Sequence, residues 1–156
     1  MRLKAHGIEI ELPHGWEGRI YRRPRADPTL HAANFPLPIR DGDFGSGATA
    51  QMPAGGAFMA LKEYRPGPRL HPGTGLFASP AIPLPLHPER FHSRALQVGR
   101  TDQAGFQHFF TAGGRPFCLY AVLKGTPARA QAAGHDVGAL GAVNEILGSL
   151  QFPSRR

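Results

Sequence analysis

The sequence predicts an α+β protein built on an antiparallel β-sheet that is covered on both faces, with a C-terminal helix packed on the sheet. Three patterns lead to this prediction: a strictly alternating segment at residues 8–12, two apolar runs joined by Gly113-Gly114, and a helical apolar spacing after Asp136. With 156 residues, 41% of them hydrophobic and 19% charged, the chain is expected to fold as one domain spanning residues 1–156.

The first part of the chain predicts extended strands. Residues 3–6 and 8–12 flank Gly7 and predict a β-hairpin. The alternation of apolar and acidic side chains in residues 8–12 predicts a strand with one face in water. Residues 16–23 resume an extended pattern, and residues 30–35 predict a short strand.

Two segments rich in proline and glycine, at about residues 24–56 and 65–93, are expected to be loops. Between them, residues 57–64 carry apolar side chains on both faces and predict a core strand. A segment without periodicity that is as long as residues 65–88 is unusual in a compact domain. It is therefore expected either to carry a function or to lie draped over the surface.

The central hairpin is the strongest local prediction. Residues 105–112 and 115–124 are strand-like runs, and the two glycines between them suit a two-residue turn with positive φ angles. Pairing Ala112 with Arg115 fixes the register and sets Phe110 opposite Phe117. Both faces of this hairpin are largely apolar, which predicts a layer above the sheet and a layer below it.

A helix is predicted at about residues 136–149. Asp136 is of the residue type that caps helix N-termini. The apolar residues at helical spacing are Val137, Leu140, Val143, Ile146 or Leu147, and Leu150. Glycines inside the segment cost the helix about 1 kcal/mol each relative to alanine, so packing on the sheet must stabilise it. Residues 150–152 then predict a short last strand.

Composition limits the setting in which the protein acts. The formal net charge of +7 comes mainly from arginine and favours acidic partners. Cys118 is the single cysteine and lies in an apolar run, so it is expected to be a buried, unreactive thiol. No run approaches the roughly 20 apolar residues of a membrane span, and the first residues do not form the apolar stretch of a signal peptide. A cytoplasmic protein without a membrane span is expected.

Both ends of the chain resemble the PsbP-like superfamily. Residues 7–16, GIEIELPHGW, are similar to its entry of strand, proline and Gly-Trp, and residues 144–152, NEILGSLQF, are similar to its C-terminal helix and last strand. The superfamily includes photosystem extrinsic subunits, a Ran-binding nuclear transport factor and bacterial relatives, some of them chaperones for secreted effectors. The resemblance extends to the central hairpin and implies an αβα sandwich with mostly non-catalytic binding roles. It brings no catalytic motif.

Residues 19–25 are the densest basic stretch of the chain. Its four arginines are Arg19, Arg22, Arg23 and Arg25. They are predicted to form a patch for an acidic protein partner, and a solvated strand end is the alternative. Pro24 interrupts the stretch and no nucleic-acid-binding motif surrounds it, so nucleic acid is not the expected partner. Association of the chain with itself stays open.

A second candidate site lies on the central hairpin. His108 sits between two phenylalanines on an apolar face. Together with Gln107 and Tyr120, it is predicted to line a ligand pocket against the hairpin. For His108 itself, a hydrogen-bonded histidine of the core or of a pocket lining is expected rather than a metal ligand.

No catalytic residue, metal ligand or cofactor is predicted. The histidines show none of the spacings typical of a zinc site, although a metal site assembled from distant histidines stays open. Residues 41–45, DGDFG, begin like a calcium loop, but Met52 stands where the bidentate glutamate is required. The serines lack the Gly-x-Ser-x-Gly setting of a nucleophile.

The function expected from these observations is a non-catalytic protein-binding or assembly module, in which the long loops present the binding surface. The alternative is a small ligand-binding protein, or an enzyme, with a pocket against the central hairpin. A pocket with convergent polar groups would favour the alternative.

Overall fold

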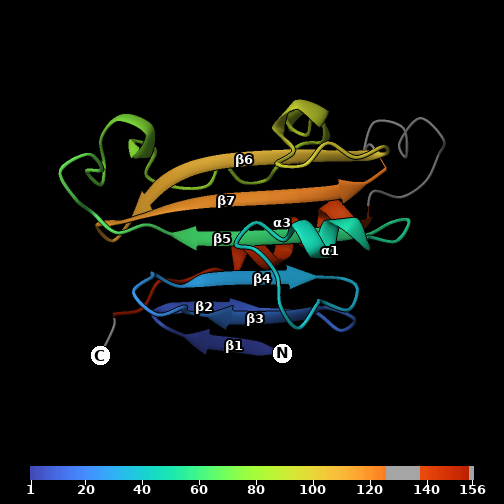
Figure 1. Cartoon of the computed structure of the whole chain (residues 1–156), viewed down its shortest axis with the longest axis horizontal. Helices are drawn as coiled ribbons and strands as arrows, with labels where there is room; N and C mark the ends of the chain where they lie inside the picture. The colour runs from blue at the N-terminus through green and yellow to red at the C-terminus, as the bar shows by residue number, and fades with distance from the viewer. Residues whose placement is uncertain (126–137, 155–156) are drawn as a thin grey trace.

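The chain forms a five-stranded antiparallel sheet, a two-stranded antiparallel sheet and a C-terminal helix (Figure 1). These elements are seen in a computed structural model, which describes residues 1–125 and 138–154. The larger sheet consists, from edge to edge, of β3 (Glu17–Tyr21), β4 (Thr29–Ala33), β5 (Ala57–Glu63), β7 (Arg115–Lys124) and β6 (Gln103–Ala112). The predicted α+β class is therefore confirmed, as are the antiparallel sheet and the C-terminal helix.

The predicted N-terminal hairpin is formed by β1 (Arg2–Ala5) and β2 (Ile8–Glu11). Its two-residue turn places His6 at a φ of 51° and Gly7 at a φ of 74°, as a turn that follows the twist of its strands requires. The two isoleucines of β2 are buried and the two glutamates are more exposed. The apolar–acidic alternation therefore separates a core face from a wet face.

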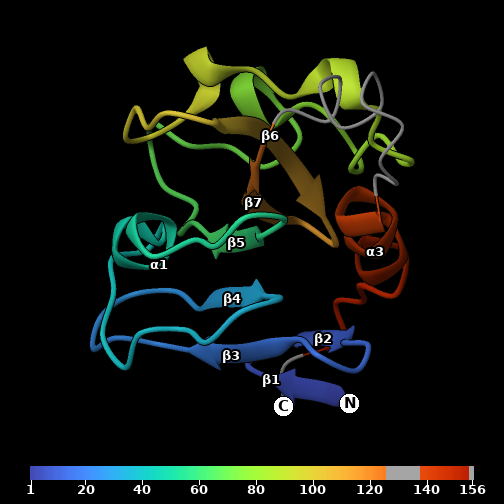
Figure 2. The same cartoon turned by 90° about the vertical axis from the view of Figure 1, so that its right-hand side faces the viewer.

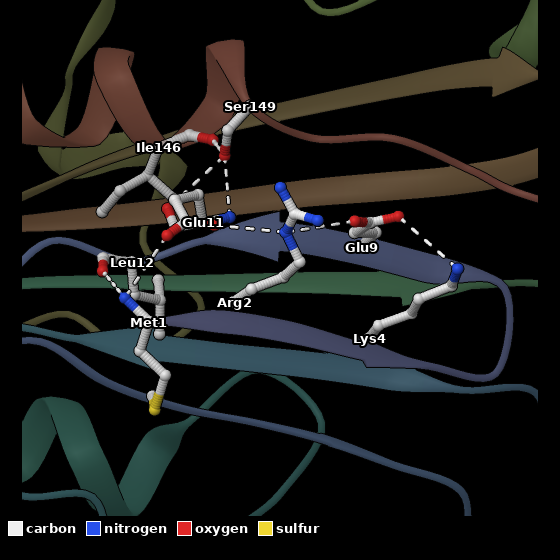
Figure 3. A network of polar contacts seen from close by, with 8 residues as sticks. All are labelled: Met1, Arg2, Lys4, Glu9, Glu11, Leu12, Ile146 and Ser149. Atoms are coloured by element: carbon white, nitrogen blue, oxygen red, sulfur yellow. Dashed lines mark hydrogen bonds and ion pairs between the residues drawn. The ribbon is translucent and has the colours of Figure 1, made fainter.

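Polar contacts tie this hairpin to the end of the C-terminal helix, α3 (Gly138–Gly148) (Figure 3). The Ser149 hydroxyl accepts the N–H of Glu11 at 2.9 Å and donates to the Ile146 carbonyl at 2.6 Å. The Arg2 Nε lies 3.5 Å from the Glu11 carboxylate on the outer side. The two-stranded sheet is thus fixed to the helix through backbone as well as side-chain groups.

The central hairpin has the predicted register. Phe110 is opposite Phe117 and Ala112 is opposite Arg115. Gly113 and Gly114 close it with φ angles of 57° and 73°, which a residue with a side chain adopts at a cost. The predicted register is confirmed at every pair. It was predictable because the turn length and the apolar pattern both specify the same pairing.

The C-terminal helix buries the predicted apolar face. Leu140, Val143, Ile146 and Leu147 are all buried in the larger apolar cluster. Asp136 and Val137 lie outside the described residues. The predicted last strand is a single antiparallel bridge between Gln151 and Glu9, with both N–H groups donating at 2.9 Å.

Apolar side chains gather in two clusters. The larger cluster includes Ile8, Ile10, Leu30, Leu61, Phe110, Phe117, Leu119, Val143 and Ile146. The smaller cluster consists of Ala33, Phe35, Ala48, Met52, Phe58, Ala60, Tyr120 and Val122. Neighbours in β7, such as Leu119 and Tyr120, fall into different clusters because successive side chains point to opposite faces. Correspondingly, α3 and α1 (Ser46–Ala50) lie on opposite sides of the five-stranded sheet (Figure 2).

The short helix α1 lies in a segment expected to be loop. The Asp41 carboxylate accepts the N–H groups of Gly47 and Ala48, each at 2.8 Å, which satisfies donors in the first turn of the helix. The sequence pattern does not reveal this helix, since one turn is too short to develop an apolar period and its capping residue precedes it by several positions.

The proline-rich segment lies along the outer edge of β6, the second of the two expected alternatives. It contains three single-turn 3₁₀ helices: η1 (Gly75–Phe77), η2 (Pro88–Arg90) and η3 (Ser93–Ala95). Backbone hydrogen bonds join Thr111 to Ser79, and Gly105 to His92, at 2.9 Å. The Asn144 side-chain amide of α3 accepts the Leu86 N–H at 2.7 Å and donates to the Leu86 carbonyl at 3.0 Å.

Candidate functional site

Polar side chains gather where β3 forms one edge of the large sheet. Arg19, Tyr21 and Arg23 point to the same face, because side chains alternate along an extended chain. Arg19 is directly opposite His31 of β4. The Tyr21 and His31 rings meet edge to face with centroids 5.3 Å apart, and the Arg23 guanidinium lies over the Tyr21 ring at 5.0 Å.

These side chains line a hollow with a volume of about 340 Å³. The residues of this arginine hollow are Arg19, Tyr21, Arg23, His31, Ile39, Arg40 and Asp41. The first four come from β3, its extension and β4, and the other three come from the loop of residues 34–45 that leads to α1. The position of this β4–α1 loop therefore determines the shape of the hollow.

Arg19 holds one end of the β4–α1 loop. Its Nη1 donates to the Ile39 carbonyl at 2.8 Å, and its Nη2 donates to the Pro38 carbonyl. Both acceptors are uncharged, so these bonds orient the guanidinium without cancelling its charge. A planar guanidinium with donors in fixed positions suits this two-point contact.

Asp43 is the centre of a charged network at the other end of the loop. Its carboxylate accepts bonds from Arg23 and from the Tyr21 hydroxyl, at 3.3 Å for the hydroxyl, and lies 2.5 Å from the Lys62 Nζ. Partial burial works to raise the pKa of Asp43, but Lys62 and Arg23 outweigh burial and hold the pKa below its ordinary value. The carboxylate is therefore ionised at neutral pH and occupied by partners within the chain.

His31 fixes the same loop from beneath. Its Nε2 lies 2.8 Å from the Asp43 carbonyl oxygen. Because a carbonyl can only accept, Nε2 carries the proton. Burial lowers the pKa of His31 below 6.5, against a smaller opposing effect of that hydrogen bond. The ring is therefore neutral at pH 7, and its edge contact with Phe58, at 5.2 Å, packs it against the smaller cluster.

The end of the loop is held by a glycine and a carboxylate. Gly45 has a φ of 68°, and a Cβ at this position would lie 2.1 Å from the Phe58 ring, so only glycine fits here. Asp41 caps α1 as described above. The two aspartates of the DGDFG segment thus hold the loop in place by binding groups of the chain itself.

The arginine hollow has a surplus of positive charge. Its lining contains three guanidinium groups and one carboxylate, and that carboxylate already accepts backbone N–H groups. Arg40 is exposed and has no hydrogen bond or ion pair with any described residue. Glu17 flanks the hollow on β3, where its carboxylate accepts the Leu37 N–H at 3.2 Å.

The four predicted patch arginines are divided between the two faces of the sheet edge. Arg19 and Arg23 line the arginine hollow. Arg22 points to the opposite face, where it lines a second hollow beside the N-terminal hairpin. Arg25 is exposed in the turn beyond the strand, at a φ of 59°.

The second predicted group, on the central hairpin, is also divided between faces. Gln107 and Tyr120 are paired across β6 and β7, whereas His108 points to the other face. The Tyr120 hydroxyl accepts the Gln97 N–H at 2.8 Å, and the His108 Nε2 lies 3.0 Å from both the Ser79 hydroxyl and the Ala81 carbonyl. Through its two contacts, His108 holds the proline-rich segment against β6.

An apolar hollow of about 260 Å³ lies against the central hairpin near His108. Its lining includes Phe110 and Ala112 of β6, Leu147 of α3, and Phe152. The lining residues are apolar or small, and the polar groups of His108 do not belong to it.

Cys118 is buried, as predicted from its neighbours. Burial raises the pKa of its thiol to about 11, so the thiol is protonated at neutral pH and a poor nucleophile. Within residues 1–125 and 138–154, no group of three or more His, Cys, Asp or Glu side chains is arranged to hold a metal ion. No helix in this part of the chain has the length and apolar character needed to cross a membrane.

Arg19 and Arg23 were predicted from the sequence to belong to a binding patch, whereas Arg40, Asp43 and Lys62 were not. The alternation of Arg19, Tyr21 and Arg23 was a usable signal for one shared face. The other residues are distant in sequence and meet only through the strand order. No protein-family model, curated protein or solved structure matches this chain.

Proposed function

We propose that this protein is a non-catalytic binding module that holds an acidic segment of a partner protein in the arginine hollow. The observation that carries the proposal is the excess of guanidinium groups over carboxylates in the lining of that hollow. Arginine suits carboxylate recognition because it presents paired donors in a fixed plane. A cationic hollow also attracts acidic partners over a distance and speeds their encounter.

Binding fits the site better than catalysis does, because its titratable groups are committed to the fold. The Asp43 carboxylate is occupied by two cations. The proton of His31 is held by a carbonyl, beneath the loop. A general base must instead reach a proton of the substrate.

Arg40→Gln tests the proposal. Arg40 is exposed and has no described contact, so its loss should leave the free energy of unfolding unchanged within about 0.5 kcal/mol. Affinity for a fluorescein-labelled oligoglutamate peptide, measured by anisotropy at low salt, should fall about three- to tenfold, since a rim charge attracts the peptide. Added salt should weaken binding to the unaltered protein, because the attraction is screened.

Arg94→Gln is the matched control. Arg94 is also exposed but belongs to η3, beside the opposite edge of the sheet. If both variants weaken binding equally, the peptide is responding to net charge and the hollow is not the site. If the unaltered protein binds no oligoglutamate, the proposal is wrong.

The apolar hollow beside Phe110 supports a second candidate function, the binding of a small apolar ligand against the central hairpin. Hollows lined by apolar side chains bind such ligands by removing apolar surface from water. Phe152→Ala should change the binding of a hydrophobic fluorescent dye in this case, whereas Arg40→Gln should not.

We also propose that the five-stranded sheet is the middle layer of an αβα sandwich of the PsbP-like kind. Support comes from the two apolar clusters and from the position of α1 and α3 on opposite sides of the sheet. Such a scaffold is rigid enough to present an edge and its loops to a partner.

A further inference from the structure

The edge strand β3 is much more exposed than the strand beside it. All five residues of β4 are buried, whereas every residue of β3 is exposed or half-buried. An edge strand presents unpaired N–H and C=O groups, and proteins usually cover such an edge. The opposite edge, β6, is covered by the proline-rich segment, through hydrogen bonds that include Thr111 N–H to the Ser79 carbonyl at 2.9 Å.

The backbone hydrogen bonds of β4 identify which peptide groups of β3 face outward. Asn34 N–H donates to the Ala57 carbonyl and Glu63 N–H donates to the Pro28 carbonyl, at 3.2 and 3.0 Å. These pairs continue the β4–β5 register, so even-numbered residues of β4 bond to β5 and odd-numbered ones bond to β3.

The β3–β4 register pairs odd residues with odd residues, for example Arg19 with His31. The peptide groups of Gly18, Ile20 and Arg22 therefore point away from the sheet. Within residues 1–125 and 138–154, none of these three uses its N–H or C=O in a described hydrogen bond. β1 lies beside β3 on its outer side (Figures 1 and 2), and Leu3 of β1 lies against Gly18 together with Leu12. The part of the edge available to a partner is therefore its other end, toward the exposed Arg22.

A basic hollow lies on each face of this edge. The arginine hollow is on the face of Arg19 and Arg23. The second hollow, of about 510 Å³, is on the face of Arg22 and is lined by Lys4, Ala5, His6, Gly7, Arg22, Pro28, Pro153 and Ser154. Its lining contains Arg22 and Lys4, and the Lys4 ammonium lies 3.9 Å from the Glu9 carboxylate, so Arg22 supplies most of its available positive charge. Side chains of an added strand would enter the two hollows alternately.

We infer that the acidic partner segment binds as an additional β-strand on the outer edge of β3. This inference rests on the proposed function, because it takes the acidic segment as the occupant. Main-chain hydrogen bonds to Ile20 and Arg22 supply affinity, and acidic side chains reach the basic hollows on either face, which is the general logic of strand addition. A second copy of this chain is the competing occupant of the edge, and an acidic segment is favoured over it because each basic hollow then receives acidic side chains.

The test compares two substitutions at Arg22. Arg22→Gln removes the charge, and Arg22→Pro removes the charge together with the outward N–H. Proline is tolerated at a sheet edge where the N–H faces solvent. Labelled oligoglutamate should bind about five- to tenfold more weakly to Arg22→Pro than to Arg22→Gln. In the unaltered protein, saturating peptide should slow amide hydrogen exchange at Ile20 at least about tenfold, while Tyr21, already bonded to β4, changes little.

The outcomes separate this inference from the proposed function. If Arg40→Gln weakens binding but the two Arg22 variants bind alike and Ile20 exchange is unchanged, strand addition is wrong and the acidic-partner function stands. If oligoglutamate does not bind, both are wrong. If Ile20 becomes protected with rising protein concentration and no peptide, the edge pairs with a second copy and the inference fails. Hydrogen exchange at Ile20 is measured on the unaltered protein, so it tests strand addition even if Arg22→Pro does not fold.

Discussion

At the scale of single residues, Asp43 connects the fold to the candidate site. Its side chain binds Lys62, Arg23 and Tyr21, and its carbonyl binds His31. These contacts fix the β4–α1 loop above the hollow. The charge of Arg23 is largely offset here, so Arg19 and Arg40 supply most of the positive charge available to a partner.

Asp43→Asn should lower the free energy of unfolding by about 1–3 kcal/mol at pH 7, because the half-buried Lys62 loses its anionic acceptor. The pKa of Asp43 is lowered in the folded protein. Its carboxylate therefore stabilises fully above the ordinary value of 3.8, and this stabilisation is lost as pH falls through the folded-state pKa. Urea denaturation at a series of pH values should show that the difference in unfolding free energy between the unaltered protein and Asp43→Asn becomes smaller in acid.

Glu89→Gln is the control for this experiment, because Glu89 is exposed on η2. His31 also destabilises the fold as pH falls below about 6.5, since its pKa is lowered too. The Asp43 charge is one of the smaller causes that raise the pKa of His31, so this effect cancels only in part in the difference. A gap that persists unchanged in acid would show that the ion pairs of Asp43 are not its source.

At the scale of elements, α3 is the layer whose removal would expose the larger cluster. Leu140→Ala should destabilise the protein by about 2–4 kcal/mol, as truncation of a buried leucine does. Glu145→Ala, on the exposed side of the same helix, should change stability by less than about 0.5 kcal/mol. Thermal or urea unfolding measures both. Equal effects of the two substitutions would mean that the helix does not pack through Leu140.

The elements also indicate what the sequence can predict here. The central hairpin was predictable to the residue, because its glycine turn and apolar pattern agree. α3 was predictable over its described part from apolar spacing. α1 was not predictable, because it depends on the distant Asp41. The extended segment at Gln151 was predicted, but its partner Glu9 was not.

The candidate site was predictable in part for the same reason. Strand alternation places Arg19 and Arg23 together and Arg22 on the other face. It cannot reveal that Asp43 reaches Lys62, because that contact depends on the path of the β4–α1 loop and on the strand order β3-β4-β5.

At the scale of the whole molecule, the two edges of the sheet are covered to different extents. The β6 edge is covered by the proline-rich segment and clamped by Asn144. The β3 edge lies between two basic hollows, is flanked by β1 at its Gly18 end and, among the described residues, forms strand pairing only with β4. This asymmetry makes the β3 end the binding end of the molecule in our proposal.

The most direct test of this claim maps an acidic peptide onto the whole protein. Oligoglutamate is titrated into isotope-labelled protein, and backbone amide shifts are followed by NMR. The proposal predicts that the largest shifts cluster at residues 18–23 and 38–41 and disappear with added salt. Shifts that instead gather around Phe110 and Leu147, or that spread over exposed arginines such as Arg69 and Arg94, would contradict it.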